Sequence, residues 1–308
     1  MTENYRAQVR LLLDVLPFVA EEPSFALKGG TAINLFVRDL PRLSVDIDLT
    51  YLPRDDRDTA LRAIGAALRR IKARIETALP GARAQLVDQG GGLEVKLLVQ
   101  RARAQIKIEV NAVLRGHLLP VRQMPSADAV QTTFEAFVEM PVLAHGELFG
   151  GKICAALDRQ HPRDLFDVQR LLDAEGLTEE VKLGLIVALI SHGRPIVELI
   201  ASAMQDREAA FTTEFAGMTL EPFDYAAHRT TFDRLRAAIF DGLTPIDRAF
   251  LVSFEAGDPD WSLFSLMDTQ HLPGVQWKLL NIRKLKAANP SKHADGVVQL
   301  ARALDQHP

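Results

Sequence analysis

Two periodic patterns of apolar and polar residues occur along this chain, and one of them predominates beyond about residue 145. Before that point, short stretches of alternating residues, typical of β-strands, stand between stretches with an apolar residue every three or four positions, typical of helices. The pattern predicts helices over 3–20, 31–37 and 56–78, and extended segments over 25–28, 45–51, 84–88, 92–99, 104–113 and 133–144. The triple glycine Gly90–Gly92 is expected to form a hairpin turn.

Beyond residue 145 the helical pattern covers most of the remaining chain. Helices are predicted over 146–158, 163–174, 178–190, 231–240, 244–253, 276–287 and 294–305. The segment from Phe211 to Tyr225 has the weakest pattern and is expected to be a connecting loop. The fold class is therefore α+β, with an α+β domain over 1–145 and a mostly helical domain over 146–308.

Composition adds the general class of protein. With 308 residues, 47% hydrophobic and 25% charged, the chain has the composition of an ordinary soluble protein and room for two domains. No stretch approaches the roughly 18 apolar residues of a membrane span, and the N-terminal segment is amphipathic rather than like a signal peptide. A cytoplasmic protein without a membrane partner is expected. The single cysteine, Cys154, lies in an apolar run and is expected to be a core residue.

Charge is unevenly distributed along the chain. The net charge is −4, but residues 271–308 hold six Lys or Arg against two Asp, so this tail carries +4 and residues 1–270 carry −8. The tail is a candidate anion-binding surface, and a solvated helix face would explain the same charge.

Two aspartates on one predicted strand are the first candidate for chemistry. Alternation places Asp46 and Asp48 on one face and Ile47 and Leu49 on the other. Carboxylates about 7 Å apart on one face repel each other unless a cation lies between them, and a divalent metal ion is the simplest such cation. A charged edge strand is the alternative.

A glycine pair precedes these aspartates. Gly29, Gly30 and Thr31 stand where a strand turns into a helix, and glycines there let backbone N–H groups approach a phosphate. Ser44, two residues before Asp46, is expected on the same strand face and is a further candidate for nucleotide binding. An ordinary turn is the alternative for the glycine pair.

Three further acids and a lysine complete the candidates. Lys107 and Glu109 share one face of their strand, so Glu109 would supply a third carboxylate for a two-metal site if this strand lies beside the first. Lys152 ends a GxxxxGK spacing, but Ile153 replaces the Ser or Thr of a P-loop, so Lys152 is expected to project from a helix toward a neighbouring site. Asp164 and Asp167 share a helix face, and either is also explained as a structural acid.

These motifs, in this order, resemble a known family. GGTA, RxSxDID, KIEV, the helix bearing Lys152, RDLFDV and the C-terminal HLPGVQWKLLNIRKL together resemble the nucleotidyltransferase toxins of the AbiEii/AbiGii type, from type IV toxin–antitoxin and abortive-infection systems. Gly151 departs from the pattern, because an acid is expected there in many relatives. The resemblance implies a DNA polymerase β-like core with a mixed sheet, and transfer of a nucleoside monophosphate from an NTP with loss of pyrophosphate.

The resemblance also implies roles for residues of the first domain. Asp46 and Asp48 would bind Mg²⁺ or Mn²⁺, and Gly29, Gly30 and Thr31 would form the phosphate cradle. Acceptors in some relatives are the 3′ ends of tRNA, so tRNA or another RNA is the expected partner, together with a cognate antitoxin.

For the remaining candidates the implied roles are less specific. Lys152 would bind the triphosphate, and one of Asp164 and Asp167 would correspond to the last motif of the family. Glu109 would be either a metal ligand or the base that activates the acceptor. Transfer to a protein hydroxyl or a small molecule, and a non-catalytic nucleotide-binding regulator, are the alternative functions.

Overall fold

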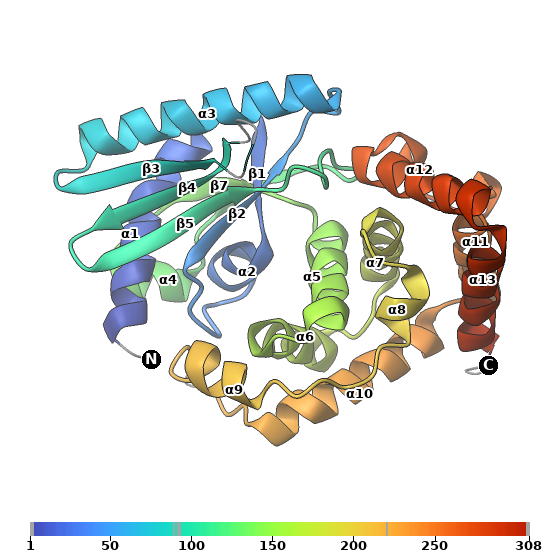
Figure 1. Ribbon diagram of the computed structural model, residues 1–308. Coiled ribbons are helices and arrows are strands. Elements are labelled where there is room, and N and C mark those ends of the chain that lie inside the picture. The colour runs from blue at the N-terminus through green and yellow to red at the C-terminus, as the bar shows by residue number, and fades with distance from the viewer. Residues whose placement is uncertain (1–2, 89, 91–93, 220, 306–308) are drawn as a thin grey trace. The chain divides into compact units, whose positions relative to one another are not determined.

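The computed structural model describes residues 3–88, 90, 94–219 and 221–305 and divides into two compact units. Unit 1 comprises Met1–Ala144 together with Ala216–Pro222, and unit 2 comprises His145–Phe215 and Phe223–Pro308 (Figure 1). The sequence pattern therefore changes near residue 145, at the point where the chain first passes from unit 1 to unit 2. Segment 216–222, expected within the helical domain, instead belongs to unit 1.

Unit 1 is built on a mixed sheet of seven strands in the order β3-β4-β5-β2-β1-β7-β6. Its strands are β1 Phe25–Lys28, β2 Asp46–Tyr51, β3 Ala82–Asp88, β4 Glu94–Arg101, β5 Ala104–Val110, β6 Arg122–Pro125 and β7 Glu139–Val142. β2 pairs in parallel with β5 and β1 with β7, whereas the other neighbours are antiparallel. A mixed sheet in an α+β unit agrees with the expected fold class.

The described part of unit 1 also contains four helices. They are α1 Glu3–Ala20, α2 Gly29–Ala32 with its π-helical continuation Ile33–Val37, α3 Arg57–Ala78 and α4 Asp128–Phe134. α3 lies along β3 and β4, and α1 packs on β5 and β7 (Figure 1). On α3, Ile64, Leu68 and Ile71 recur at helical spacing and are fully buried. Ile47 and Leu49 of β2 are buried as well, which leaves the opposite face of β2 for its polar residues.

Most predicted elements of unit 1 are present within a few residues of the expected bounds. The extended stretch at 133–144 was predicted wrongly over its first part, because Asp128–Phe134 is a helix and the strand begins at Glu139. β6 was not predicted, because its sequence RQMP has no alternation of apolar and polar residues. β3 and β4 pair antiparallel as a hairpin requires, but Gly91 and Gly92 of the expected turn lie outside the described residues.

Unit 2 consists of helices in its described part. They are α5 His145–Arg159, α6 Pro162–Ala174, α7 Glu179–Ser191, α8 Ile196–Ile200, α9 Glu208–Ala210 with the π-helical turn Phe211–Phe215, α10 Tyr225–Gly242, α11 Pro245–Glu255, α12 Pro273–Ala288 and α13 Pro290–Asp305. All seven predicted helices are present, whereas the short α8 and α9 were not predicted. Polar side chains mark several helix starts: Thr244 and Asp247, for example, form a reciprocal capping box at α11.

Three glycines let α5 and α7 approach each other closely. A Cβ atom on Gly150 would overlap the backbone of Gly184 and Leu185, and a Cβ on Gly184 would overlap the carbonyl of Gly146. Two glycines of the GELFGGK stretch therefore serve helix packing, and α5 runs unbroken through the stretch. This is the physical reason why the GxxxxGK spacing is not a phosphate loop.

The returning segment of unit 1 contacts the chain just before β2. The amide of Leu43 donates to the carbonyl of Met218 over 2.8 Å, and the Thr219 hydroxyl donates to the carbonyl of Pro41 over 2.9 Å. The loop expected between Phe211 and Tyr225 is thus partly a helical turn and partly an extended segment of unit 1.

No helix in the described part of the chain combines the length and apolar character needed to cross a membrane.

Candidate active site

The strand that carries Asp46 and Asp48 lies between β5, which carries Lys107 and Glu109, and β1, which ends directly before the glycine pair. In the parallel pairing with β5, Asp46 is opposite Lys107 and Asp48 is opposite Glu109. In the antiparallel pairing with β1, Asp48 is opposite Lys28. Directly opposed residues in a sheet project from the same face. The two strands do lie side by side, as the hypothesis of a third carboxylate requires.

A row of four charged residues crosses this polar face. Lys28 of β1, Asp48 of β2, Glu109 of β5 and Lys96 of β4 occupy successive positions in the register. Lysines thus stand at both ends of the row with carboxylates between them. The negative charges of Asp48 and Glu109 therefore lie next to each other. Each carboxylate has a lysine on its other side, Lys28 beside Asp48 and Lys96 beside Glu109.

Glu109 is bound by lysines. Its carboxylate lies 2.8 Å from Nζ of Lys107 and 3.5 Å from Nζ of Lys96. Burial alone would raise the pKa of Glu109, but the hydrogen bond from Lys107 and the two positive charges outweigh it, so the pKa is lowered. Among the described residues, no three acidic, histidine or cysteine side chains gather closely enough to share a metal ion. The role of Glu109 as a ligand or a base therefore stays a prediction.

Side chains of the site pack closely around the glycine pair Gly29 and Gly30. Gly29 has a positive φ of 70°, and a Cβ there would stand 2.5 Å from a carboxylate oxygen of Asp48. A Cβ on Gly30 would stand 2.7 Å from the guanidinium of Arg42 and 2.9 Å from the hydroxyl of Ser44. Both positions require glycine because the site residues already occupy the space.

Two hydroxyls tie the glycine turn to β2. Oγ1 of Thr31 lies 3.0 Å from Oγ of Ser44 and hydrogen bonds to the backbone carbonyl of Asp46. Both side chains are buried, and Ser44 precedes β2 instead of lying on the strand. In the structure these hydroxyls hold the site together, and a direct role for Thr31 and Ser44 in nucleotide binding stays a prediction.

Sequence reasoning assigned no role to three cations of this region, although Arg42 is the first residue of the motif RxSxDID. Lys28 ends β1 directly before the glycine pair, Lys96 joins the polar face from β4, and Arg42 is a fully buried arginine beside Gly30. The alternation along β4 would have indicated that Lys96 lies on a polar strand face. The position of Lys28 directly before the glycine pair would have indicated a site residue equally well. Arg42 follows a proline in a segment without periodicity, so its burial has no sequence signal.

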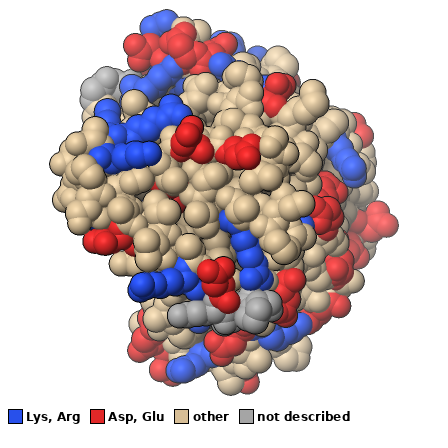
Figure 2. Space-filling model, turned by 90° about the vertical axis from the view of Figure 1, so that its right-hand side faces the viewer, with Lys and Arg blue, Asp and Glu red and all other residues tan. Residues whose placement is uncertain are grey.

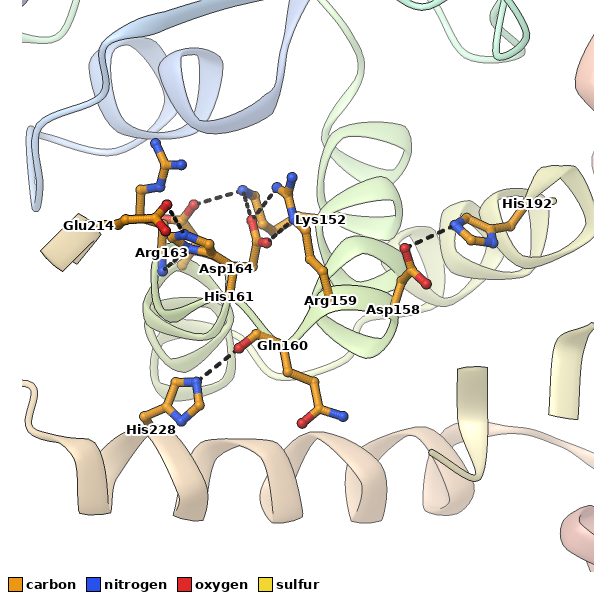
Figure 3. Close-up of polar contacts among 11 residues, drawn as sticks. Lys152, Asp158, Arg159, Gln160, His161, Arg163, Asp164, His192, Glu214 and His228 are labelled. Carbon is orange, nitrogen blue, oxygen red and sulfur yellow. Dashed lines mark hydrogen bonds and ion pairs between the residues drawn. The ribbon is translucent and has the colours of Figure 1, made fainter. Parts of the chain in front are cut away.

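Unit 2 holds a second polar cluster around Lys152. The Lys152 ammonium lies 2.8 Å from Oδ1 of Asp164 and 3.0 Å from Oδ2 of Asp167, and all three side chains are at most 5% exposed. The Arg159 guanidinium donates two hydrogen bonds to Asp164, over 2.6 and 3.1 Å (Figure 3). Both aspartates between which the sequence left a choice therefore contact Lys152.

Asp164 is ionised in this cluster. Its burial would raise the pKa, but the charges of Lys152 and Arg159 and their hydrogen bonds lower the pKa of Asp164 far below its ordinary range. The buried ammonium of Lys152 and the largely exposed guanidinium of Arg159 both offset the charge of Asp164. Buried ion pairs of this kind are strongly destabilised when one partner is removed.

The corner between α5 and α6 fixes the geometry of this cluster. Gln160 takes a left-handed backbone conformation with φ of 49°, and its carbonyl lies 3.1 Å from Nε2 of His228 on α10 (Figure 3). The next residue, His161, accepts a hydrogen bond from the amide of Arg163 and so caps α6. The corner therefore sets where Arg159 leaves α5 and where Asp164 enters α6.

Asp46 and Asp48 supply a donor set that suits a hard divalent cation. Mg²⁺ is commonly held by one or two carboxylates together with phosphate oxygens of a substrate. The two carboxylates share a sheet face, and Asp48 packs directly against the glycine turn. The residues present thus fit Mg²⁺ or Mn²⁺ bound with a phosphorylated ligand.

A family model shows the family of this chain, and a solved structure shares its fold. The model of the family "Nucleotidyl transferase AbiEii toxin, Type IV TA system" matches residues 10–273, a range that includes both polar clusters. Among solved structures, the chain is similar to MenT4, a nucleotidyltransferase toxin from Mycobacterium tuberculosis H37Rv, with a TM-score of 0.60 and 17% identity over 90% of this chain and 93% of that chain. No protein of the curated set matches the sequence.

Proposed function

Because this chain belongs to the AbiEii family of nucleotidyltransferase toxins from type IV toxin–antitoxin systems, we propose that it transfers a nucleoside monophosphate from an NTP to the 3′ end of tRNA. Pyrophosphate is released, and the modified tRNA no longer supports translation. The observation that carries the proposal is the placement of Asp46 and Asp48 on one sheet face, with Asp48 directly against the glycine turn.

Asp46 and Asp48 are the residues proposed to hold Mg²⁺ or Mn²⁺. When bound there, the ion would neutralise phosphate charge and stabilise the charge that develops on the leaving pyrophosphate. The backbone at Gly29 and Gly30 would contact the phosphates, because glycines at a strand-to-helix turn let backbone N–H groups approach an anion. Arg42, whose guanidinium lies beside Gly30, would add positive charge at the same place.

Glu109 is assigned to holding the lysines of the polar face. A carboxylate whose pKa is lowered is a weaker base than an ordinary one, and Glu109 is lowered by its bond to Lys107. Proton transfer from the acceptor hydroxyl would also require Glu109 to leave that bond. We therefore favour the positioning role over the role of general base.

In unit 2, we propose that Asp167 is the functional acid and Asp164 its structural counterpart. Arg159 clamps Asp164 in a bidentate pair, which fixes that carboxylate against Lys152. Lys152 binds both aspartates. When its ammonium binds a triphosphate, a phosphate oxygen would therefore replace one of these carboxylates as its partner. Asp164→Asn is then expected to reduce protein stability, whereas Asp167→Asn reduces transfer with a smaller loss of stability.

The surface of α12 supports RNA as the acceptor. This helix of 16 residues has no acidic side chain, and Arg283, Lys284 and Lys286 are exposed on it. Trp277 is 49% exposed and offers a ring on which a base can stack. Figure 2 views the structure from the side on which α12 and α13 are drawn in Figure 1, and shows Lys and Arg side chains in separate groups, with Asp and Glu side chains near them and uncharged surface between. Aromatic and basic side chains together are typical of proteins that bind single-stranded ends.

The acceptor is identified by following the label. Purified protein is incubated with Mg²⁺, each α-labelled NTP in turn, and total tRNA, other RNA or lysate protein. The proposal expects label on tRNA that is removed by a 3′ exonuclease. Label on protein or on a small molecule would replace tRNA with that acceptor class, and NTP binding without any pyrophosphate release would establish a regulator instead.

A further inference from the structure

Lys28 occupies the junction between the two halves of the proposed site. It is the last residue of β1, it stands opposite Asp48 in the register, and Gly29 follows it directly. Lys28 itself is extended, whereas Gly29 takes a left-handed conformation against the Asp48 carboxylate. The backbone at Lys28 is therefore fixed by the sheet on one side and by the glycine turn on the other.

The side chain of Lys28 belongs to the polar face of the sheet. Burial lowers the pKa of Lys28, and the negative charges of Asp48 and Glu109, its electrostatic partners, offset part of that lowering. Lys96 of β4 and Lys107 of β5 already bind Glu109. Lys28 is the lysine that the register places directly opposite Asp48, and Lys107 is a second electrostatic partner of Asp48.

Charges on this face are balanced. Its ionisable groups in the register of the four strands are three lysines and three acids, namely Lys28, Lys96, Lys107, Asp46, Asp48 and Glu109. With all of them ionised the face has no net charge. A divalent cation arriving alone would meet two carboxylates whose field is offset by resident ammonium groups.

We propose that Lys28 is a resident counter-ion of Asp48 that couples metal binding to nucleotide binding. In the free protein its ammonium stabilises the Asp48 carboxylate and competes with a metal ion. When metal and nucleotide bind together, the same ammonium pairs with a phosphate at the neighbouring glycine turn. This inference rests on the proposed function, because it takes the phosphates to lie at Gly29 and Gly30.

Removal of this one charge should then have two opposite effects. In Lys28→Met, Mn²⁺ alone should bind more tightly, because its competitor is gone. Nucleotide should bind more weakly, because a phosphate partner is gone. A residue that only supported the fold would weaken both kinds of binding, so the opposite signs distinguish a counter-ion from a structural lysine.

Lys96→Met is the matched control. Lys96 lies at the other end of the same row and its carboxylate partner is Glu109, at 3.5 Å. The substitution removes the same charge from the same sheet face, but away from Asp48 and the glycine turn. A general change in surface potential would act equally in both variants, whereas the proposal expects the larger shifts in Lys28→Met.

The experiment measures Mn²⁺ binding without nucleotide by electron paramagnetic resonance, and binding of each NTP with Mg²⁺ by calorimetry. For Lys28→Met we expect the Kd of Mn²⁺ to fall about tenfold and the Kd of the bound NTP to rise about tenfold, each roughly 1.4 kcal/mol. Circular dichroism verifies folding, and Lys28→Gln, which removes the charge with a polar side chain, carries the same expectation. Lys28→Arg should resemble the wild type in Mn²⁺ binding.

Two outcomes overturn the inference. Mn²⁺ binding that is unchanged or weaker in both Lys28→Met and Lys28→Gln contradicts the competition, and unchanged NTP binding contradicts the phosphate contact. If the wild type binds Mn²⁺ and NTP normally, either result leaves the proposed function intact. A wild type that binds neither overturns the proposed function and this inference with it.

Discussion

Lys152 is a buried cation held between two buried carboxylates, and its neighbour Arg159 completes the charge balance. The polar face of the sheet in unit 1 uses the same principle, with lysines on either side of Asp48 and Glu109. In both places lysines keep a carboxylate ionised: Lys152 of α5 acts on Asp164 of α6, and Lys107 of the same strand together with Lys96 of β4 acts on Glu109. The chemistry proposed for each cluster depends on exchanging one of these pairings for a phosphate.

Loss of Lys152 should destabilise unit 2. In Lys152→Met the Asp164 and Asp167 carboxylates stay buried without their shared ammonium, so the free energy of unfolding should fall by about 3–5 kcal/mol. Chemical denaturation measures the change. Arg234→Met is the control, since it removes a half-exposed partner of Asp173 and should cost about 0–1 kcal/mol. Equal losses for both variants would contradict the buried network.

Acid should weaken the contribution of Asp164. Its pKa is lowered in the folded protein, so its stabilisation is complete above the ordinary pKa of 3.8 and is lost as the pH falls through the folded pKa. The difference in unfolding free energy between wild type and Asp164→Asn should be constant from pH 7 to pH 5. It should then shrink below about pH 4. A difference that stays constant down to pH 3 would show that the carboxylate is not held ionised by its partners.

At the scale of elements, the contact between α5 and α7 holds the helix that bears Lys152. Two adjacent glycines on α5 have opposite surroundings: a Cβ on Gly150 would overlap the α7 backbone, whereas nothing lies within 4 Å of a Cβ on Gly151. The side of α5 that packs on α7 is therefore distinct from the side on which Gly151 lies.

This contrast gives a paired prediction. Gly150→Ala should lower the free energy of unfolding by about 1–3 kcal/mol, because the helices must separate. Gly151→Ala should raise it by about 0.5–1 kcal/mol, because alanine is the better helix former in open space. Thermal and chemical unfolding of the two variants test this directly, and a similar loss in both would contradict the close helix contact.

Elements with a strong period were predictable from the sequence. Strand alternation placed Asp46 and Asp48 on one face, and the helical period placed α5, α6 and α7. β6, α8 and α9 were not predictable because each is five residues or shorter and has no distinct period. The return of segment 216–222 to unit 1 depends on backbone hydrogen bonds to residues 41–43, which leave no pattern in the sequence.

Candidate residues were predictable in part for the same reason. The period shows which residues share a strand face, but it does not show which strands are neighbours, so Lys28 and Lys96 were missed. The lysines that bind Glu109 could not be assigned without the register. The double contact of Lys152 with Asp164 and Asp167 likewise depends on the corner between two helices.

At the scale of the whole molecule, charge is divided between an acidic majority of the chain and a basic C-terminal tail. Lys284→Glu on the acid-free helix α12 should weaken RNA binding and reduce the slope of log K against log salt by about 1 to 2, since one phosphate contact is lost and one repulsion added. Arg10→Glu on α1 makes the same charge change in the other unit and is the control. Equal effects in filter binding at several salt concentrations would contradict a role for α12.

The central claim is that the polar face of β2 performs nucleotidyl transfer. The most direct test compares transfer of labelled nucleotide from each NTP to tRNA by the wild type, Asp46→Asn and Asp48→Asn, with unfolding curves recorded for all three. We expect transfer by the wild type and a loss of at least about 100-fold in each variant with the fold retained, because the phosphate charge is no longer stabilised. Transfer that continues at the wild-type rate in either folded variant would contradict the account.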